Sequence, residues 1–105
     1  MVIDTSALLA VLLHETDAER IAAAIEAASP RLLSAANLLE ASIIIESRKG
    51  EAGGRELDLL LYRGGIEGLN YGDCSAYALA KSRRLPLLFR GNDFSQTDVD
   101  CVPVP

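Results

Sequence analysis

The sequence predicts an α/β fold in which a short, mostly parallel sheet is covered by helices on both faces. Short apolar runs of strand length alternate along the chain with longer segments whose apolar residues recur at helical spacing. Half of the 105 residues are hydrophobic and 24% are charged, the balance of a globular protein. We therefore expect a single domain over residues 1–105.

The first half of the chain is predicted to contain two strands and three helices. The strands are the apolar runs at residues 2–3 and 31–33. The helices span residues 6–13, from 16 or 17 to about 28, and about 35–49. Ser6 and Ser34 are N-cap residues of two of these helices, and Pro30 ends the second because proline cannot continue the helical hydrogen bonds.

The second half is predicted to add two helices and the remaining strands. Gly50 and the pair Gly53-Gly54 separate the third helix from the fourth. The predicted helices span residues 55–63 and about 72–84, and the predicted strands lie at 66–67, at 85–89 and within 98–104. In parallel sheets ligands bind outside the carboxyl ends of the strands, so a functional site is expected there.

Four acidic residues lie beside these apolar segments, where a carboxylate is costly unless it is neutralised or binds a cation. They are Asp4, Glu40, Asp73 and Asp93. Asp4 ends the first strand, Asp93 follows a late strand by a short turn, and the other two lie in early turns of helices. The parallel topology brings all four to one rim of the sheet, with Asp98 within reach. This arrangement predicts a divalent-metal pocket that activates water for phosphoryl displacement.

Each of these residues also has a purely structural alternative. Asp4 can cap a helix, with Ser6 competing for that position, and Ser6 can instead orient a metal-bound water. Glu40 can be an exposed glutamate, although it interrupts an otherwise apolar helical stripe. Asp73 can be favoured by the helix dipole, and Asp93 can be a turn residue. The metal-site interpretation depends on their meeting at one rim.

Charge and composition exclude several functional classes. The net charge of −5 disfavours a sequence-reading DNA binder but leaves a metal-dependent nuclease open, and basic residues gather locally at Arg48-Lys49, Arg83-Arg84 and Arg90. No apolar run reaches the roughly 18 residues that span a bilayer, and no secretory signal is evident, so we expect a cytoplasmic protein with no membrane partner. The single histidine, His14, lies at a helix end and disfavours zinc chemistry. Two cysteines are too few for a disulfide framework.

Four segments of the chain resemble the PIN-domain family. They are Val-Ile-Asp-Thr-Ser-Ala at 2–7, Ser-Ala-Ala-Asn-Leu-Leu-Glu-Ala at 34–41, Leu-Asn-Tyr-Gly-Asp-Cys at 69–74, and Gly-Asn-Asp-Phe-Ser-Gln-Thr-Asp at 91–98. The match is collinear and covers nearly the whole chain. Within the family, the segments are most similar to the VapC-type toxins of bacterial toxin–antitoxin pairs.

This resemblance implies a fold, an activity and a set of partners. The implied fold is a Rossmann-like three-layer α/β/α sandwich, and the implied activity is that of an endoribonuclease dependent on Mg²⁺ or Mn²⁺. The implied partners are an RNA substrate, a cognate VapB-type antitoxin that blocks the site, and a second copy in a homodimer. The family's acidic metal-binding and catalytic positions fall on Asp4, Glu40, Asp73 and Asp93, and its accessory positions fall on Ser6 and Asp98.

The chain departs from the family at Glu67-Gly68, where a longer strand and another helix would precede the 69–74 motif. The short join is either an omitted segment or a real deletion, and omission is favoured because both flanks match the family well. A real deletion favours an alternative function. The chain would then be a catalytically impaired, truncated PIN domain that dimerises and binds an antitoxin.

Two other metal-dependent phosphate chemistries on a similar sheet are disfavoured. A phosphatase of the haloacid-dehalogenase type places a second aspartate two residues after the first, where this chain has Ser6. A receiver domain needs a lysine at the end of a late strand, where this chain has Arg90.

Overall fold

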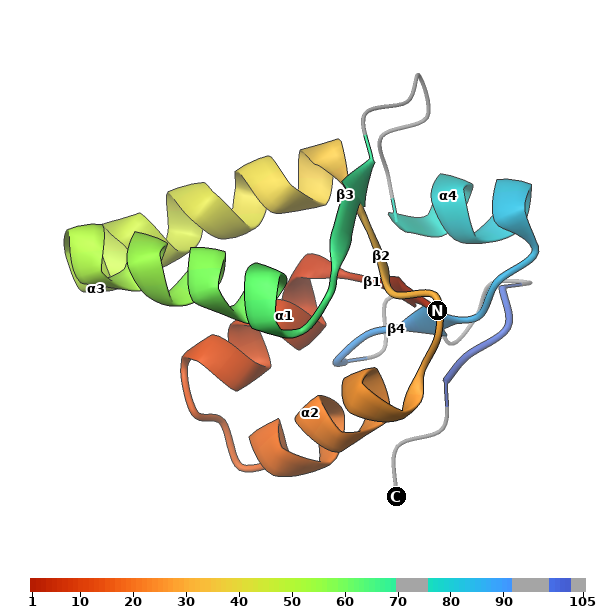
Figure 1. Cartoon of the computed structure of the whole chain (residues 1–105), viewed down its shortest axis with the longest axis horizontal. Helices are drawn as coiled ribbons and strands as arrows, with labels where there is room; N and C mark the ends of the chain where they lie inside the picture. Colours follow the sequence, from red (N-terminus) through yellow and green to blue (C-terminus); the bar gives the residue numbers. More distant parts are fainter. Residues whose placement is uncertain (70–75, 92–98, 103–105) are drawn as a thin grey trace.

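A computed structural model describes residues 1–69, 76–91 and 99–102 of the chain. Within these residues, four short strands form one parallel sheet with the order β3-β2-β1-β4 (Figure 1). They are β1 (Val2–Ile3), β2 (Leu32–Ser34), β3 (Glu67–Leu69) and β4 (Leu87–Leu88). A parallel bridge between Leu87 and Cys101 extends the sheet beyond β4.

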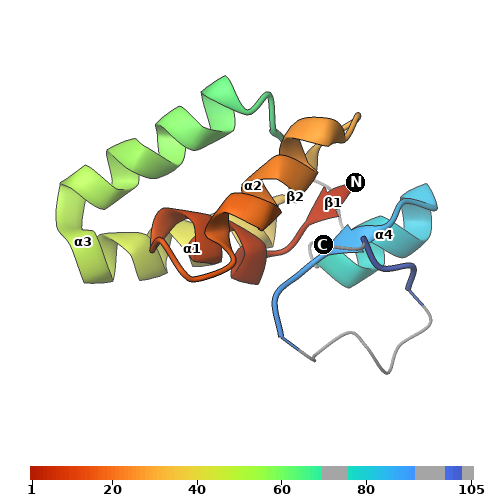
Figure 2. The same cartoon turned by 90° about the horizontal axis from the view of Figure 1, so that it is seen from below.

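Helices connect these strands, as the parallel topology requires. The helices of the described residues are α1 (Thr5–Leu12), α2 (Ala18–Ala27), α3 (Ala35–Arg63) and α4 (Ala76–Arg83). α3 consists of two arms that meet at a sharp bend, which is clearest in Figure 2. The bend lies at Gly50, whose φ of 65° and ψ of −155° are accessible almost only to glycine. None of these helices is both long enough and apolar enough to cross a bilayer.

Different helices cover the two faces of the sheet, because successive strand residues point to opposite sides. The residues that pack with α1, α2 and α3 are Ile3, Leu33 and Leu88, and those that pack with α4 are Val2, Leu32 and Leu87. All six are at most 4% exposed. Figure 1 shows the same arrangement, with the sheet between α4 and the other helices. The predicted α/β/α sandwich is confirmed, and continuous apolar runs are typical of strands buried on both faces.

Two helix boundaries differ from the predicted ones. α1 begins at Thr5, and its N-cap is Asp4, whose side chain accepts a hydrogen bond from the backbone N of Ser6; Ser6 is therefore not the cap. The fourth predicted helix begins directly after Gly50, because Gly53 and Gly54 are helical. A Cβ at Gly53 would lie 2.8 Å from the carbonyl oxygen of Ile45, so this glycine allows the two arms of α3 to approach. The Ser34 cap of α3 is confirmed.

Several strand boundaries also differ from the predicted ones. β4 covers only residues 87–88 of the predicted 85–89, since the backbone N of Leu85 donates to the carbonyl of Ala80 at the end of α4. β3 runs through residues 67–69, whereas 66–67 was predicted. The predicted last strand is represented by the bridge at Cys101. The predicted start of α4 near residue 72 lies outside the described residues.

Candidate metal centre

Asp4 lies at the carboxyl edge of the sheet, between β1 and α1. Its Oδ2 accepts hydrogen bonds from the backbone N of Ser6 at 3.1 Å and from Ser6 Oγ at 2.6 Å. Its Oδ1 accepts a hydrogen bond from Nδ2 of Asn37 at 3.1 Å. No lysine or arginine of the described residues forms an ion pair with this half-buried carboxylate. Its negative charge is therefore oriented by uncharged donors and is not cancelled by a basic side chain.

Asn37, in the first turn of α3, belongs to a buried polar network beneath Asp4. Besides its bond to Asp4, Nδ2 donates to Oγ1 of Thr5 at 2.7 Å, and Oδ1 accepts from Ser34 Oγ at 2.5 Å. Thr5 Oγ1 in turn donates to the backbone carbonyl of Asn37 at 3.1 Å. Asn37, Thr5 and Ser34 are 9%, 3% and 1% exposed, so the bonds among these three residues are made away from water. Such a fully satisfied network fixes one arrangement of its members.

Sequence reasoning did not single out Asn37 or Thr5 as site residues. Both are polar residues that lie within one helical turn after the end of a strand, at the edge where a site was expected. A buried amide needs partners for its donors and its acceptor, and Asp4 is the charged group nearest in the predicted topology. That requirement is the signal that would have found Asn37.

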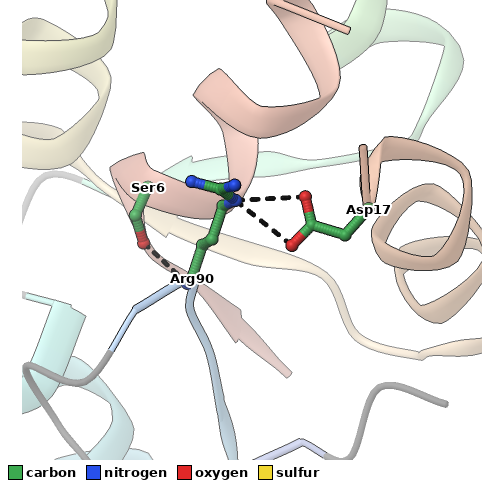
Figure 3. Close-up of polar contacts among 3 residues, drawn as sticks. All are labelled: Ser6, Asp17 and Arg90. Atoms are coloured by element: carbon green, nitrogen blue, oxygen red, sulfur yellow. Dashed lines mark hydrogen bonds and ion pairs between the residues drawn. The ribbon is translucent and has the colours of Figure 1, made fainter. Parts of the chain in front are cut away.

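Ser6 connects Asp4 to the segment that follows β4. Its Oγ donates to Asp4 and accepts a hydrogen bond from the backbone N of Arg90 at 2.9 Å (Figure 3). The Nε of Arg90 lies 3.0 and 3.1 Å from the two carboxylate oxygens of Asp17, just before α2. These contacts hold the beginning of the 90–93 segment against α1. The accessory role of Ser6 near a metal ion stays a prediction.

Glu40 follows Asn37 by one turn of α3 and is exposed. Apolar residues do surround Glu40 on α3, but near Glu40 they face solvent. Leu39 is 63% exposed and Ile43 is 60% exposed. Glu40 therefore interrupts an apolar stripe that is exposed at this level, and its role as a metal ligand stays a prediction. Residues three apart are neighbours on a helix surface, so Glu40 lies on the side of α3 that carries Asn37 toward Asp4.

The remaining predicted acids, Asp73, Asp93 and Asp98, lie outside the described residues. Within residues 1–69, 76–91 and 99–102, no three His, Cys, Asp or Glu side chains are grouped to hold a metal ion. Only Asp4 and Glu40 of the four predicted ligands belong to that part of the chain. The meeting of all four acids at one rim stays a prediction.

The backbone beside Asp4 is consistent with that prediction for Asp93. β1 and β4 pair in parallel, and the backbone N of Asp4 donates to the carbonyl of Leu88 at 2.9 Å. The chain therefore leaves β4 at the same edge at which Asp4 leaves β1. The oxygen groups of Asp4 and Ser6 suit a hard cation such as Mg²⁺. His14 is exposed, and Cys101 is a free thiol.

A family comparison agrees with this geometry. The model of the PIN-domain family matches residues 1–67, which include Asp4, Ser6, Asn37 and Glu40. The chain belongs to the PIN-domain family. The PIN-domain match covers the strands β1 and β2, the helices α1 to α3 and the first residue of β3.

Curated relatives extend the similarity over the whole PIN domain. Ribonuclease VapC30 of Mycobacterium tuberculosis is 47% identical over 131 residues, with 100% of both chains covered. Ribonuclease VapC of Mycolicibacterium smegmatis is 45% identical over 128 residues, covering 97% of this chain and 99% of the relative. Ribonuclease VapC28 of M. tuberculosis is 38% identical over 126 residues, covering 94% and 95%. The resemblance carried by the four sequence segments is thereby confirmed.

Proposed function

We propose that this PIN domain is a metal-dependent endoribonuclease and the toxin of a VapBC-type toxin–antitoxin pair. The observation that carries the proposal is the carboxylate of Asp4, held by three uncharged donors at the carboxyl edge of the sheet. It occurs in a chain whose relatives, matched over their full length, are named VapC ribonucleases. Mg²⁺ or Mn²⁺ bound there would supply Lewis acidity for in-line displacement at phosphorus.

The residues of the chain have distinct parts in this proposal. Asp4 is a direct metal ligand, and Asn37 and Ser6 hold its two oxygens in fixed directions. We assign Glu40, Asp73 and Asp93 as the other acidic ligands, and Asp98 as an accessory group. The bond between Ser6 Oγ and the backbone N of Arg90 supports the assignment of Asp93, since residue 93 follows three positions later.

The proposed partners are RNA, a cognate VapB-type antitoxin and a second copy of the chain. The VapC names of the relatives support the first two. Exposed apolar side chains on α3 offer a surface for a protein partner: Leu39, Ile43, Leu59 and Tyr62 are between 49% and 87% exposed.

A second candidate function is supported by the alignment lengths. The alignment with VapC30 runs over 131 residues, more than the 105 of this chain, so the relative has residues with no counterpart here. If those residues are truly deleted, the chain is a truncated PIN domain that binds antitoxin without cutting RNA. The join between Glu67 and Gly68 lies inside β3, at the residue where the family match ends.

Cleavage of single-stranded RNA by the purified protein, with and without EDTA, tests the proposal. Asp4→Asn is the informative variant because asparagine caps a helix as well as aspartate does, so α1 is retained while a negative ligand is lost. We expect cleavage to require added Mg²⁺ or Mn²⁺ and to fall at least about 100-fold in Asp4→Asn. Asp58→Asn, an exposed residue of α3, is the matched control and should cleave normally.

Cleavage by Asp4→Asn at the wild-type rate would contradict the assignment of Asp4. Wild-type protein that cuts no RNA with either metal, yet binds its antitoxin, would favour the second candidate.

A further inference from the structure

An open pocket of about 210 Å³ begins beside Ser6 and follows one side of α1 away from Asp4. Its floor is formed by Ser6, Leu9, Ala10 and Leu13, which are spaced i, i+3, i+4 and i+7 and so share one helix face. From Ser6 to Leu13 this face is about 10 Å long. Leu9 and Leu13 are half-buried, so the floor is apolar but reachable from solvent. The pocket therefore adjoins the candidate metal centre through Ser6, whose Oγ is bonded to Asp4.

Charged side chains form the rim of this pocket. Arg48 comes from the first arm of α3, Arg90 from the segment after β4, and Glu15 from the turn after α1. The guanidinium of Arg90 is bonded to Asp17, so its charge is already balanced. With Arg90 paired to Asp17, the remaining charges of the rim are the positive charge of Arg48 and the negative charge of Glu15.

Arg48 differs from the neighbouring basic residues of the described part of the chain. Lys49 donates to the carbonyl of Leu12 and forms an ion pair with Glu56. Arg48 is exposed and makes no hydrogen bond or ion pair with any described residue. The planar guanidinium of Arg48 is therefore available to bind a ligand, and its paired N–H donors match the spacing of phosphate oxygens.

We propose that this pocket is an RNA subsite that binds a nucleotide next to the scissile phosphodiester. Arg48 holds the phosphate, and the apolar floor at Leu9 and Leu13 contacts the sugar or base. The inference rests on the proposed ribonuclease function. The pocket is placed next to the scissile bond because it adjoins Ser6, and Ser6 is bonded to Asp4. Proteins hold single-stranded nucleic acid by pairing basic side chains with its backbone and by stacking its bases on aromatic rings or guanidinium planes, and Arg48 offers both a positive charge and such a plane.

The test compares Arg48→Gln with Arg55→Gln, a matched exposed arginine on the other arm of α3. Among the described residues, Arg55 forms an ion pair with Glu51 at 4.0 Å. Binding of a fluorescein-labelled single-stranded RNA to the full chain is measured by anisotropy in EDTA, so that no cleavage occurs, over a series of salt concentrations. We expect Arg48→Gln to weaken binding about threefold to tenfold. It should also reduce the slope of log K against log salt by about 0.7, the value for one phosphate contact on a single strand. Arg55→Gln should match the wild type.

Two further measurements sharpen the result. Glu15→Gln removes the negative charge from the rim and should tighten RNA binding about twofold to threefold at low salt. In the metal-containing cleavage assay, Arg48→Gln should raise KM while kcat is nearly unchanged, because the contact is made in the bound and transition states alike.

The possible failures are distinguishable. If the wild type cleaves RNA but Arg48→Gln and Arg55→Gln bind equally, the subsite is wrong and the ribonuclease proposal stands. If the wild type neither binds nor cleaves RNA, both are wrong. If Arg48→Gln binds RNA normally but binds the cognate antitoxin weakly, the pocket is a protein docking site and the subsite proposal is overturned.

Discussion

The side chain of Asn37 determines how Asp4 is presented at the edge of the sheet. One amide bonds the carboxylate of Asp4, the hydroxyl of Thr5 and the hydroxyl of Ser34, and all of these bonds are half-buried or buried. Two of the three partners come from elements far away in sequence, at a separation of 32 or 33 residues. Asn37 therefore joins the start of α1 to the start of α3, and it acts on the proposed chemistry only through Asp4.

Replacing Asn37 by alanine should impair both stability and metal use. The change removes two donors and an acceptor from a buried network, which costs about 2–3 kcal/mol of unfolding free energy. It also frees Oδ1 of Asp4, so the Mg²⁺ or Mn²⁺ concentration for half-maximal cleavage should rise about 10-fold to 100-fold. Urea unfolding and metal titrations of activity measure the two effects.

Ser42→Ala is the control for this variant. Ser42 lies on the same helix and donates only to the carbonyl of Leu38 among the described residues, so its removal should leave the metal titration unchanged. A metal requirement in Asn37→Ala equal to that of the wild type would show that Asn37 supports the fold without positioning Asp4.

At the scale of the elements, Arg31 joins the carboxyl ends of two helices. Its guanidinium donates to three backbone carbonyls: Nε to that of Ala28 at 2.9 Å, Nη2 to that of Glu26 at 2.7 Å, and Nη1 to that of Gly64 at 2.6 Å. The last carbonyls of a helix lack partners within the helix and carry partial negative charge, which a guanidinium satisfies. α2 leads into β2, and α3 leads into β3. By joining the ends of these two helices, Arg31 helps to set the register in which Leu32 pairs with Glu67.

Arg31→Lys keeps the charge but cannot make three separate bonds in one plane. We expect the free energy of unfolding to fall by about 1–3 kcal/mol, since charged hydrogen bonds to half-buried carbonyls are lost. Arg63→Lys, an exposed change in the last turn of α3, should stay within about 0.5 kcal/mol of the wild type. Urea denaturation of both variants provides the measurement. Equal midpoints for the two variants would contradict the role of Arg31.

At the scale of the whole molecule, local patterns predicted the fold better than they predicted the site. Apolar runs at β1, β2 and β4 indicated strands buried on both faces, and their alternation with helices indicated the parallel sheet that brings Asp4 beside the end of β4. These inferences hold because burial and periodicity are properties of neighbouring residues.

The contacts that the sequence did not reveal are made between distant residues or depend on which way a helix faces. The ion pair of Arg90 with Asp17 joins residues 73 positions apart, and no periodicity identifies such a partner. The sequence placed Glu40 within an apolar stripe of the third helix, and in the structure the nearby Leu39 and Ile43 face solvent. A helical pattern gives the relative positions of residues on a helix, whereas only packing decides which side is buried.

The proposed ligands also come from separate parts of the chain, so metal binding should stabilise the whole domain. An ion present at ten times its dissociation constant contributes about 1.4 kcal/mol to the native state, provided that the unfolded chain does not bind it. For a domain of this size that corresponds to a rise in Tm of about 6–11 °C. Thermal unfolding with Mn²⁺, compared with NaCl of equal ionic strength, measures the shift, and EDTA should reverse it.

Asp4→Asn should lose most of the shift, while Asp58→Asn should keep it. Because this measurement requires no RNA cleavage, it tests the metal centre even in a chain that is catalytically impaired, and an equal shift in Asp4→Asn would place the ion elsewhere.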